Sequence, residues 1–149
     1  MKLFQIEEPE GAAADPEQPG VAIGIDIGGE VAEVAISVGG NALVLGDRDG
    51  FLLDLAVPTP DAVTAEWQRL LEGARLRAER ALAQPATHAV LAVAATPDRE
   101  FAERLFAAGA AAGLTVLHLL APAELAVGEA PALAAAVLAE ALAPRPPLA

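Results

Sequence analysis

Residues 21–27 alternate between large apolar side chains and small or polar ones, which indicates a β-strand, because successive side chains of a strand point to opposite faces. The two faces of this strand are Val21, Ile23, Ile25 and Ile27 on one side and Ala22, Gly24 and Asp26 on the other. The same pattern predicts a second strand over residues 31–38 and a third over 41–46, joined by a tight turn at Gly39-Gly40. Residues 51–57 are expected to form a fourth short strand or an extended segment.

After Asp61 the apolar residues recur with the period of a helix. Apolar residues fall on one stripe through about residue 83, and they include Trp67, which we expect in the core. Asp61 is the expected N-cap of this helix, because its carboxylate can accept a hydrogen bond from a backbone amide of the first turn. Residues 88–94 are almost wholly apolar, which is typical of a strand covered on both faces.

The last part of the chain predicts two further helices and one strand. Thr96 as cap and Pro97 at the first helical position predict the start of a helix that Gly113 ends. A strand is expected over residues 115–120, and helical sequence that Pro131 interrupts follows it.

The order of these elements indicates the fold class. Antiparallel strands followed by alternating helices and strands predict an α/β fold, in which a β-meander and then βαβα units form one mixed sheet with helices on both faces. Residues 20–143 are expected to form a single lobe, 1–19 a disordered acidic leader and 144–149 a Pro-rich tail.

Composition narrows the classes of function. The 149 residues carry a net charge of −12, and such a surface repels nucleic-acid phosphates, so we expect no nucleic-acid partner. The absence of cysteine excludes a disulfide scaffold and a thiolate metal site, and it fits a cytoplasmic protein.

One uncharged stretch, residues 105–123, approaches the ~20 residues that a membrane-spanning helix needs. Gly113 divides it into a helical part and a strand-like part, so we expect a helix and a strand in a packed core rather than a membrane span.

Two motifs suggest a family. "GIDIGGEVAEVAI" resembles the first phosphate loop of the actin-like ATPases, and "AVLAVAATPDREFAERLFAAGAAAGLTVL", residues 89–117, resembles the DnaK-like chaperone stretch that runs from "AVITVPAYF" to "AGLEVL". "LLAPAELAVG" is similar to that family's "INEPTAAALAYG". The resemblance covers residues 21 to about 129 and implies a ribonuclease H-like fold, here the N-terminal lobe of a DnaK-like, actin-like ATPase.

The resemblance also implies a site for ATP and Mg²⁺. Gly28 and Gly29 would let backbone amides approach a phosphate, and Asp26 would act as the metal residue, through Mg²⁺ and its waters. Glu30 stands where the family has a loop hydroxyl, and its carboxylate would repel a γ-phosphate unless a metal ion lay between them.

Other family features are missing. The aromatic of "VPAYF" is lost in "VAATP", Ala121-Pro122-Ala123 replaces a Glu-Pro-Thr motif, and no lysine follows Lys2. None of the 149 residues resembles the family's second lobe, which would complete the nucleotide site. We therefore do not expect an active ATPase from the lobe alone.

Three functions stay open. The first is a degenerate lobe that works as a protein-interaction or chaperone-like module with weak or lost ATP binding, contacting a partner or another copy through its exposed cleft face and Ala-rich C-terminal helix. The second is an ATP and Mg²⁺ half-site that a dimer or another chain completes. The third is a Holliday-junction-resolvase-like nuclease, which needs Asp26 and further carboxylates on a metal, with Glu66, Asp98, Glu124 and Glu129 as candidates.

Neither histidine has a partner at ligand spacing. His88 opens a strand and His118 lies within one, so core or edge positions are expected for both rather than metal binding or catalysis.

Overall fold

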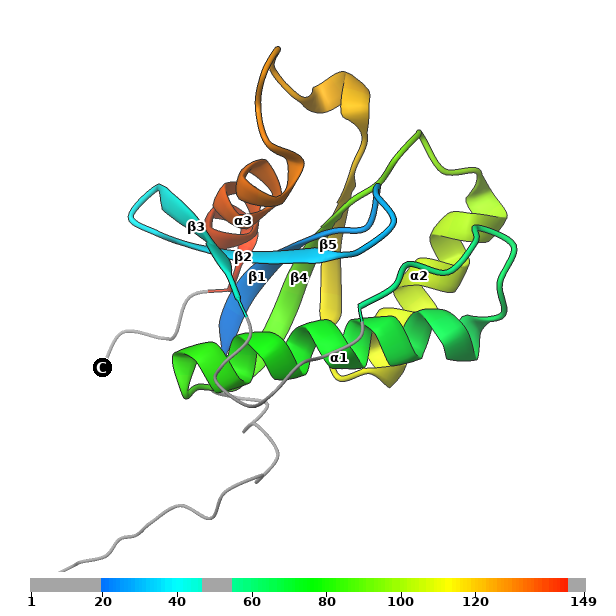
Figure 1. Cartoon of the computed structure of the whole chain (residues 1–149), viewed down its shortest axis with the longest axis horizontal. Helices are drawn as coiled ribbons and strands as arrows, with labels where there is room; N and C mark the ends of the chain where they lie inside the picture. Colours follow the sequence, from blue (N-terminus) through cyan, green and yellow to red (C-terminus); the bar gives the residue numbers. More distant parts are fainter. Residues whose placement is uncertain (1–19, 47–54, 145–149) are drawn as a thin grey trace, which may run out of the picture.

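The computed structural model describes residues 20–46 and 55–144, and these residues form one five-stranded sheet with helices on both sides (Figure 1). The strands, in sheet order β3-β2-β1-β4-β5, are β3 (Asn41–Leu45), β2 (Glu33–Val38), β1 (Val21–Asp26), β4 (Ala86–Ala92) and β5 (Thr115–Leu120). The helices are α1 (Thr64–Leu82), α2 (Arg99–Ala111), the 3₁₀ turn η1 (Pro122–Glu124) and α3 (Pro131–Leu142).

The sheet is mixed, as the sequence predicts. β1 pairs antiparallel with β2, and β2 with β3, whereas β1 pairs parallel with β4, and β4 with β5. An antiparallel meander is therefore followed by two crossover units, which confirms the predicted α/β class and the mixed sheet. The assignment to the ribonuclease H-like fold stays a prediction.

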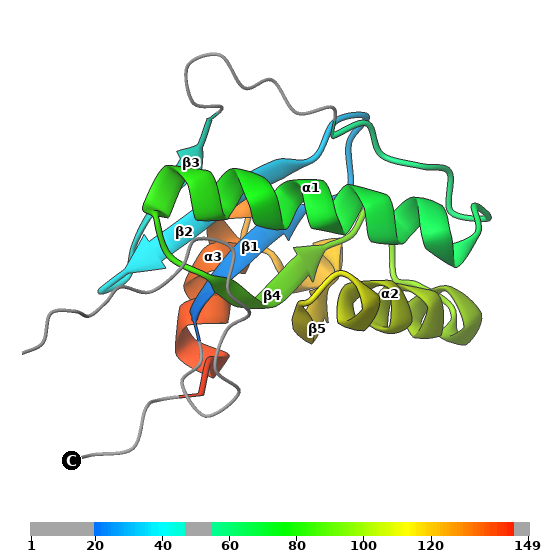
Figure 2. The ribbon, with the colours of Figure 1, turned by 90° about the horizontal axis from the view of Figure 1, so that it is seen from below.

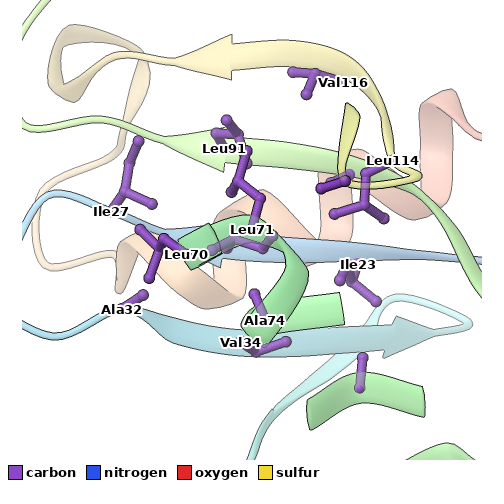
Figure 3. Packing of buried hydrophobic residues seen from close by; sticks show 14 of the residues in the cluster. Ile23, Ile27, Ala32, Val34, Leu70, Leu71, Ala74, Leu91, Leu114 and Val116 are labelled. Atoms are coloured by element: carbon purple, nitrogen blue, oxygen red, sulfur yellow. The ribbon is translucent and has the colours of Figure 1, made fainter. Parts of the chain in front are cut away.

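The large-residue face of β1 forms the main core, under α1 and α2 (Figure 2). Leu70, Leu71 and Ala74 of α1 lie over Ile23 of β1 and Leu91 of β4 (Figure 3). Trp67 is 1% exposed and packs edge-on against Phe101 of α2, with ring centroids 5.3 Å apart. The prediction that Trp67 belongs to the core is confirmed.

Helix α3 covers the opposite face of the sheet, where it packs on the small residues of β1. Ala22 packs against Ala135 and Ala139 of α3. At Gly24 the two backbones come so close that an added Cβ would lie 2.3 Å from the amide nitrogen of Ala136. A residue larger than glycine therefore does not fit at this position of the strand unless α3 moves.

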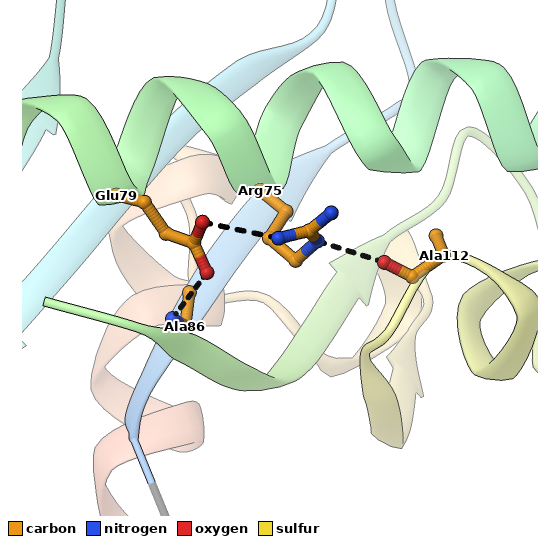
Figure 4. A network of polar contacts seen from close by, with 4 residues as sticks. All are labelled: Arg75, Glu79, Ala86 and Ala112. Carbon is orange, nitrogen blue, oxygen red and sulfur yellow. Dashed lines mark hydrogen bonds and ion pairs between the residues drawn. The ribbon is translucent and has the colours of Figure 1, made fainter. Parts of the chain in front are cut away.

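A polar network fixes α1 relative to its neighbours (Figure 4). The Arg75 guanidinium donates to the carbonyl of Ala112 at 2.8 Å, and to the carboxylate of Glu79 at 3.0 Å. The same carboxylate accepts from the backbone N–H of Ala86 at 2.9 Å. One pair of side chains on α1 thus holds both the end of α2 and the start of β4.

Two predicted helix caps are wrong. α1 begins at Thr64 without a side-chain cap, because the Asp61 carboxylate accepts a hydrogen bond from the Thr59 hydroxyl at 2.7 Å. α2 begins at Arg99 rather than at Pro97, and its cap is Asp98 rather than Thr96: the Asp98 carboxylate accepts from the Phe101 amide at 2.8 Å.

Other element boundaries moved by a few residues. The second strand begins at Glu33 rather than 31, and Val31 instead forms an isolated bridge with Ala56. The strand predicted over 88–94 spans Ala86–Ala92, and Pro131 begins α3 instead of interrupting a longer helix. The strand over 115–120 and the helix end at Gly113, with φ of +88°, are confirmed.

Some predictions lie outside the described residues, namely the acidic leader over 1–19, most of the fourth strand, and the tail from residue 145. Within 20–46 and 55–144, no helix is long and apolar enough to cross a membrane. The uncharged stretch over 105–123 is divided at Gly113 into the end of α2 and strand β5, as predicted.

Candidate functional site at the carboxyl edge of the sheet

The parallel strands β1, β4 and β5 end at one edge of the sheet, and the loops that follow them lie there (Figure 1). The amide of Ile27 donates to the Ala92 carbonyl at 2.8 Å, and the amide of Val93 donates to the Leu120 carbonyl at 3.0 Å. These bonds carry the parallel pairing slightly beyond the strands. In open α/β sheets, ligand sites form at such carboxyl edges.

Asp26 ends β1 on the face that α3 covers, and its side chain is partly exposed. Its Oδ1 accepts a hydrogen bond from the backbone N–H of Gly28 at 2.8 Å. The carboxylate thus closes its own turn, as an aspartate commonly does at the start of a loop. One of the amides expected to meet a phosphate already has an acceptor.

Gly28 lies at a close approach between two loops, and its backbone angle is not unusual. An added Cβ would lie 3.2 Å from Asp26 Oδ1 and 3.3 Å from the Cα and the amide nitrogen of Ala94. Its φ is outside the left-handed region. The loop after β1 therefore packs its backbone against the loop after β4. At Gly29 an added Cβ would make only an ordinary contact, 3.9 Å from the carbonyl oxygen of Val31.

Glu30 projects into solvent while its backbone is held. Its carbonyl accepts from the Val57 amide at 2.9 Å, and the amide of Ala32 donates to the Leu55 carbonyl at 2.8 Å. An extended segment before α1 thus pairs with the loop. The structure places Asp26, Gly28, Gly29 and Glu30 in one short turn with a defined conformation.

Glu33 is a member of this edge that the sequence did not indicate. It lies directly opposite Asp26 in the antiparallel β1–β2 pair, so both carboxylates are on the same face. Two like charges in that position disfavour the pair unless solvent or a cation screens them. The six-residue connection between β1 and β2 has no turn motif that would have fixed this register.

His118 has an acidic partner that sequence spacing concealed. Its Nε2 is 2.8 Å from Oε1 of Glu124, and Glu124 Oε2 accepts from the amide of Ala121 at 2.9 Å. The expectation that His118 has no carboxylate partner is wrong, because the η1 turn brings Glu124, six residues further along the chain, back to the His118 side chain. The Ala121 hydrogen bond first, and the His118 contact second, lower the pKa of Glu124.

His88 lies near the amino end of β4, at the opposite edge of the sheet from the candidate site. Its Nδ1 is 2.8 Å from the Thr87 hydroxyl, and burial lowers the pKa of the imidazole. The expected core or edge position is confirmed for this residue.

The carboxylates required by a nuclease are not brought together. Asp98 caps α2, Glu124 holds Ala121 and His118, and Glu129 accepts from the Ala126 amide at 2.8 Å. Glu66 projects from the exposed side of α1. Within the described residues, no three His, Cys, Asp or Glu side chains are grouped as a metal site would need.

Comparison with protein-family models finds no match, and no curated protein is significantly similar to the chain.

Proposed function

We propose that this chain is a degenerate lobe of the actin-like ATPase type that acts in the cytoplasm as a protein-interaction or chaperone-like module. By itself it binds ATP weakly or not at all and does not hydrolyse it. The observation that carries the proposal is the hydrogen bond from the Gly28 amide to the Asp26 carboxylate.

A phosphate loop works because several backbone amides point at the anion and have no other acceptor. Here Asp26 takes the first amide, and Ala94 lies against the same turn. A phosphate would have to displace that carboxylate and then lie near Asp26, Glu30 and Glu33. Each uncompensated charge pair at about 4 Å costs about 1 kcal/mol even in water.

The surface that supports an interaction role is α3. Its twelve residues contain a single charged side chain, Glu140, which bonds to Ser37, Gly39 and Gly40 of the β2–β3 hairpin. Helices that are apolar all round are usually covered on all sides. A protein partner on the outer side of α3 would provide that cover.

Thermal unfolding in a ligand titration tests the loss of nucleotide binding. We expect no change in melting temperature with millimolar Mg-ATP, with ATP alone or with Mg²⁺ alone. A ligand at 100 times its Kd would add about 2.7 kcal/mol to stability, which is several degrees for a chain of this size. A shift of that size, abolished in Asp26→Ala and Glu30→Ala, would overturn this part of the proposal.

A half-site for ATP and Mg²⁺ is the second candidate, and the position of the loop favours it. The chain leaves β1 toward β2 and leaves β4 toward α2, in opposite directions, next to the Asp26 turn. Ligands of open α/β sheets bind where connections diverge in this way. If a dimer or another chain completes the site, Mg-ATP will shift the assembly equilibrium of wild type, and Asp26→Ala will remove that effect.

A further inference from the structure

Strand β3 forms one outer edge of the sheet, and no described strand lies beyond it (Figure 1). Its sequence, NALVL, contains no charge and no proline, and its pairing with β2 shows no bulge. Such features protect the free edges of most sheets, because an exposed apolar edge otherwise adds strands. β3 has none of them, and its Leu43 and Val44 are 56% and 47% exposed. The edge is therefore suited to accept another strand.

Both the backbone and the side chains of β3 are available to such a strand. The two-residue Gly39-Gly40 turn, with both φ values positive, sets which pairs of the β2–β3 ladder are hydrogen-bonded, and these pairs alternate. The amide and carbonyl groups of Ala42 and Val44 therefore point away from β2, toward the open edge. The side chains of Leu43 and Val44 lie on opposite faces of the sheet. A strand with apolar residues on both of its faces would fit there.

The first residues of the chain have that pattern. Within the leader, residues 1–19, the large apolar side chains all fall in the first six positions, MKLFQI. In an extended segment Leu3 lies on one face and Phe4 and Ile6 lie on the other. Composition predicts disorder for the free leader, and segments of that kind can become ordered when they bind. The leader therefore contains a strand-like segment at the end of a polar linker, residues 9–20.

We infer that residues 1–8 add to the sheet beside β3 and antiparallel to it. β1 is antiparallel to β2, so Gly20, where the leader joins β1, lies at the same end of the sheet as the Gly39-Gly40 turn. Followed backward from Gly20, the leader meets β3 first at Asn41 and then continues toward Leu45. Its own chain direction is therefore opposite to that of β3, which gives antiparallel pairing.

The length of the linker agrees with this placement. A strand beyond β3 lies three strand spacings from β1, which is about 14 Å. A flexible linker as long as residues 9–20 spans about 20 Å on average. The segment can therefore reach the outer edge of β3 without straining the linker.

The covalent tether selects this segment over a second copy or a strand of another protein. A segment on a short linker acts at an effective concentration in the millimolar range, far above that of a second copy in micromolar protein. A strand from another molecule could add to this edge only by displacing the leader. The leader therefore controls access to the edge, and this role is separate from the nucleotide site and from the outer side of α3.

Amide hydrogen exchange in the full-length protein, followed by NMR, tests the pairing. We expect the Ala42 and Val44 amides to exchange at least ~10-fold more slowly in wild type than in Phe4→Asp, because both amides are hydrogen-bonded only while the segment is docked. The matched control, Ala12→Asp, adds the same charge within the linker and should keep the wild-type protection. Circular dichroism verifies that both variants are folded.

A spin label tests the direction of the strand, since the chain contains no cysteine to compete for the label. With the label on Lys2→Cys, the amide signal of Leu45 should broaden several-fold more than that of Asn41. The two residues lie about 14 Å apart along β3, so the nitroxide distinguishes them. Stronger broadening at Asn41 would overturn the antiparallel arrangement.

Equal exchange of the Ala42 and Val44 amides in wild type and Phe4→Asp would overturn the inference itself. If the amides are protected in both proteins, a different segment covers the edge, and if they are open in both, nothing covers it. Protection that rises with protein concentration would assign the added strand to a second copy and would reject the leader as its source. None of these results depends on nucleotide, so the proposed function is tested separately.

Discussion

Gly24→Ala is expected to destabilise the protein strongly, although glycine-to-alanine changes in strands usually stabilise. Alanine restricts the unfolded chain, and a compatible site gains about 0.4–1 kcal/mol from that restriction. At Gly24 the added Cβ would lie 2.3 Å from the amide nitrogen of Ala136 and 2.7 Å from the carbonyl carbon of Ala135. Both are backbone atoms, so no rotamer change relieves the contact.

Helix α3 would have to retreat by about 1 Å to restore ordinary contact, and a gap of that size forfeits a quarter to a half of the dispersion attraction of each atom pair. Ala135 and Ala139 of α3 pack in the cluster that holds Ala22 of β1, and Ala132 and Ala136 pack with Ala35 of β2. Together with the strain of overpacking, we expect a net loss of about 2–3 kcal/mol, which lowers the melting temperature by roughly 5–10 °C.

Urea unfolding measures the effect, with the fluorescence of the single, buried Trp67 reporting on the α1–α2 side and circular dichroism reporting on all helices. Gly29→Ala is the matched control, because its Cβ would make only an ordinary contact with the Val31 carbonyl oxygen at 3.9 Å and its φ is compatible with alanine. The control should be neutral or slightly stabilising. If Gly24→Ala unfolds within 0.5 kcal/mol of Gly29→Ala, α3 does not pack on β1 as described.

Two further predictions concern polar contacts. Glu140→Gln should cost about 1–2 kcal/mol, because charge-assisted hydrogen bonds to the hairpin become neutral ones, whereas Glu103→Gln, at a 72% exposed position, should change the urea midpoint little. Glu124 has a lowered pKa, so its contribution is complete above the ordinary value of 4.5 and is lost as pH falls through the folded pKa. Glu124→Gln should therefore flatten the fall in stability below about pH 4.5, and an unchanged acid limb would contradict the Ala121 and His118 contacts.

Element type was predictable where local chemistry and packing agree. The apolar run over 115–120 and the left-handed Gly113 give the same boundary in the sequence and in the structure. Helix starts were less predictable, because several nearby residues can supply or lose a cap. The Asp61 carboxylate accepts a hydrogen bond from the Thr59 hydroxyl and does not cap α1, and Asp98 rather than Thr96 caps α2. Contacts between elements were invisible from local patterns, which explains why Glu33 and the His118–Glu124 pair were missed.

The face of β1 that carries Asp26 illustrates the limit most clearly. Asp26 was expected to hold a ligand, but Ala22 and Gly24 on the same face are small because α3 packs on them. Asp26 lies two residues, about 7 Å, further along the same face, and there the paired residue changes from the buried Ala35 to the exposed Glu33. Packing against α3 therefore accounts for the small side chains of Ala22 and Gly24. On this face of β1, the Asp26 turn is what is left as a candidate ligand site. Because that turn already satisfies its own Gly28 amide, α3 is the better place to look for what this protein binds.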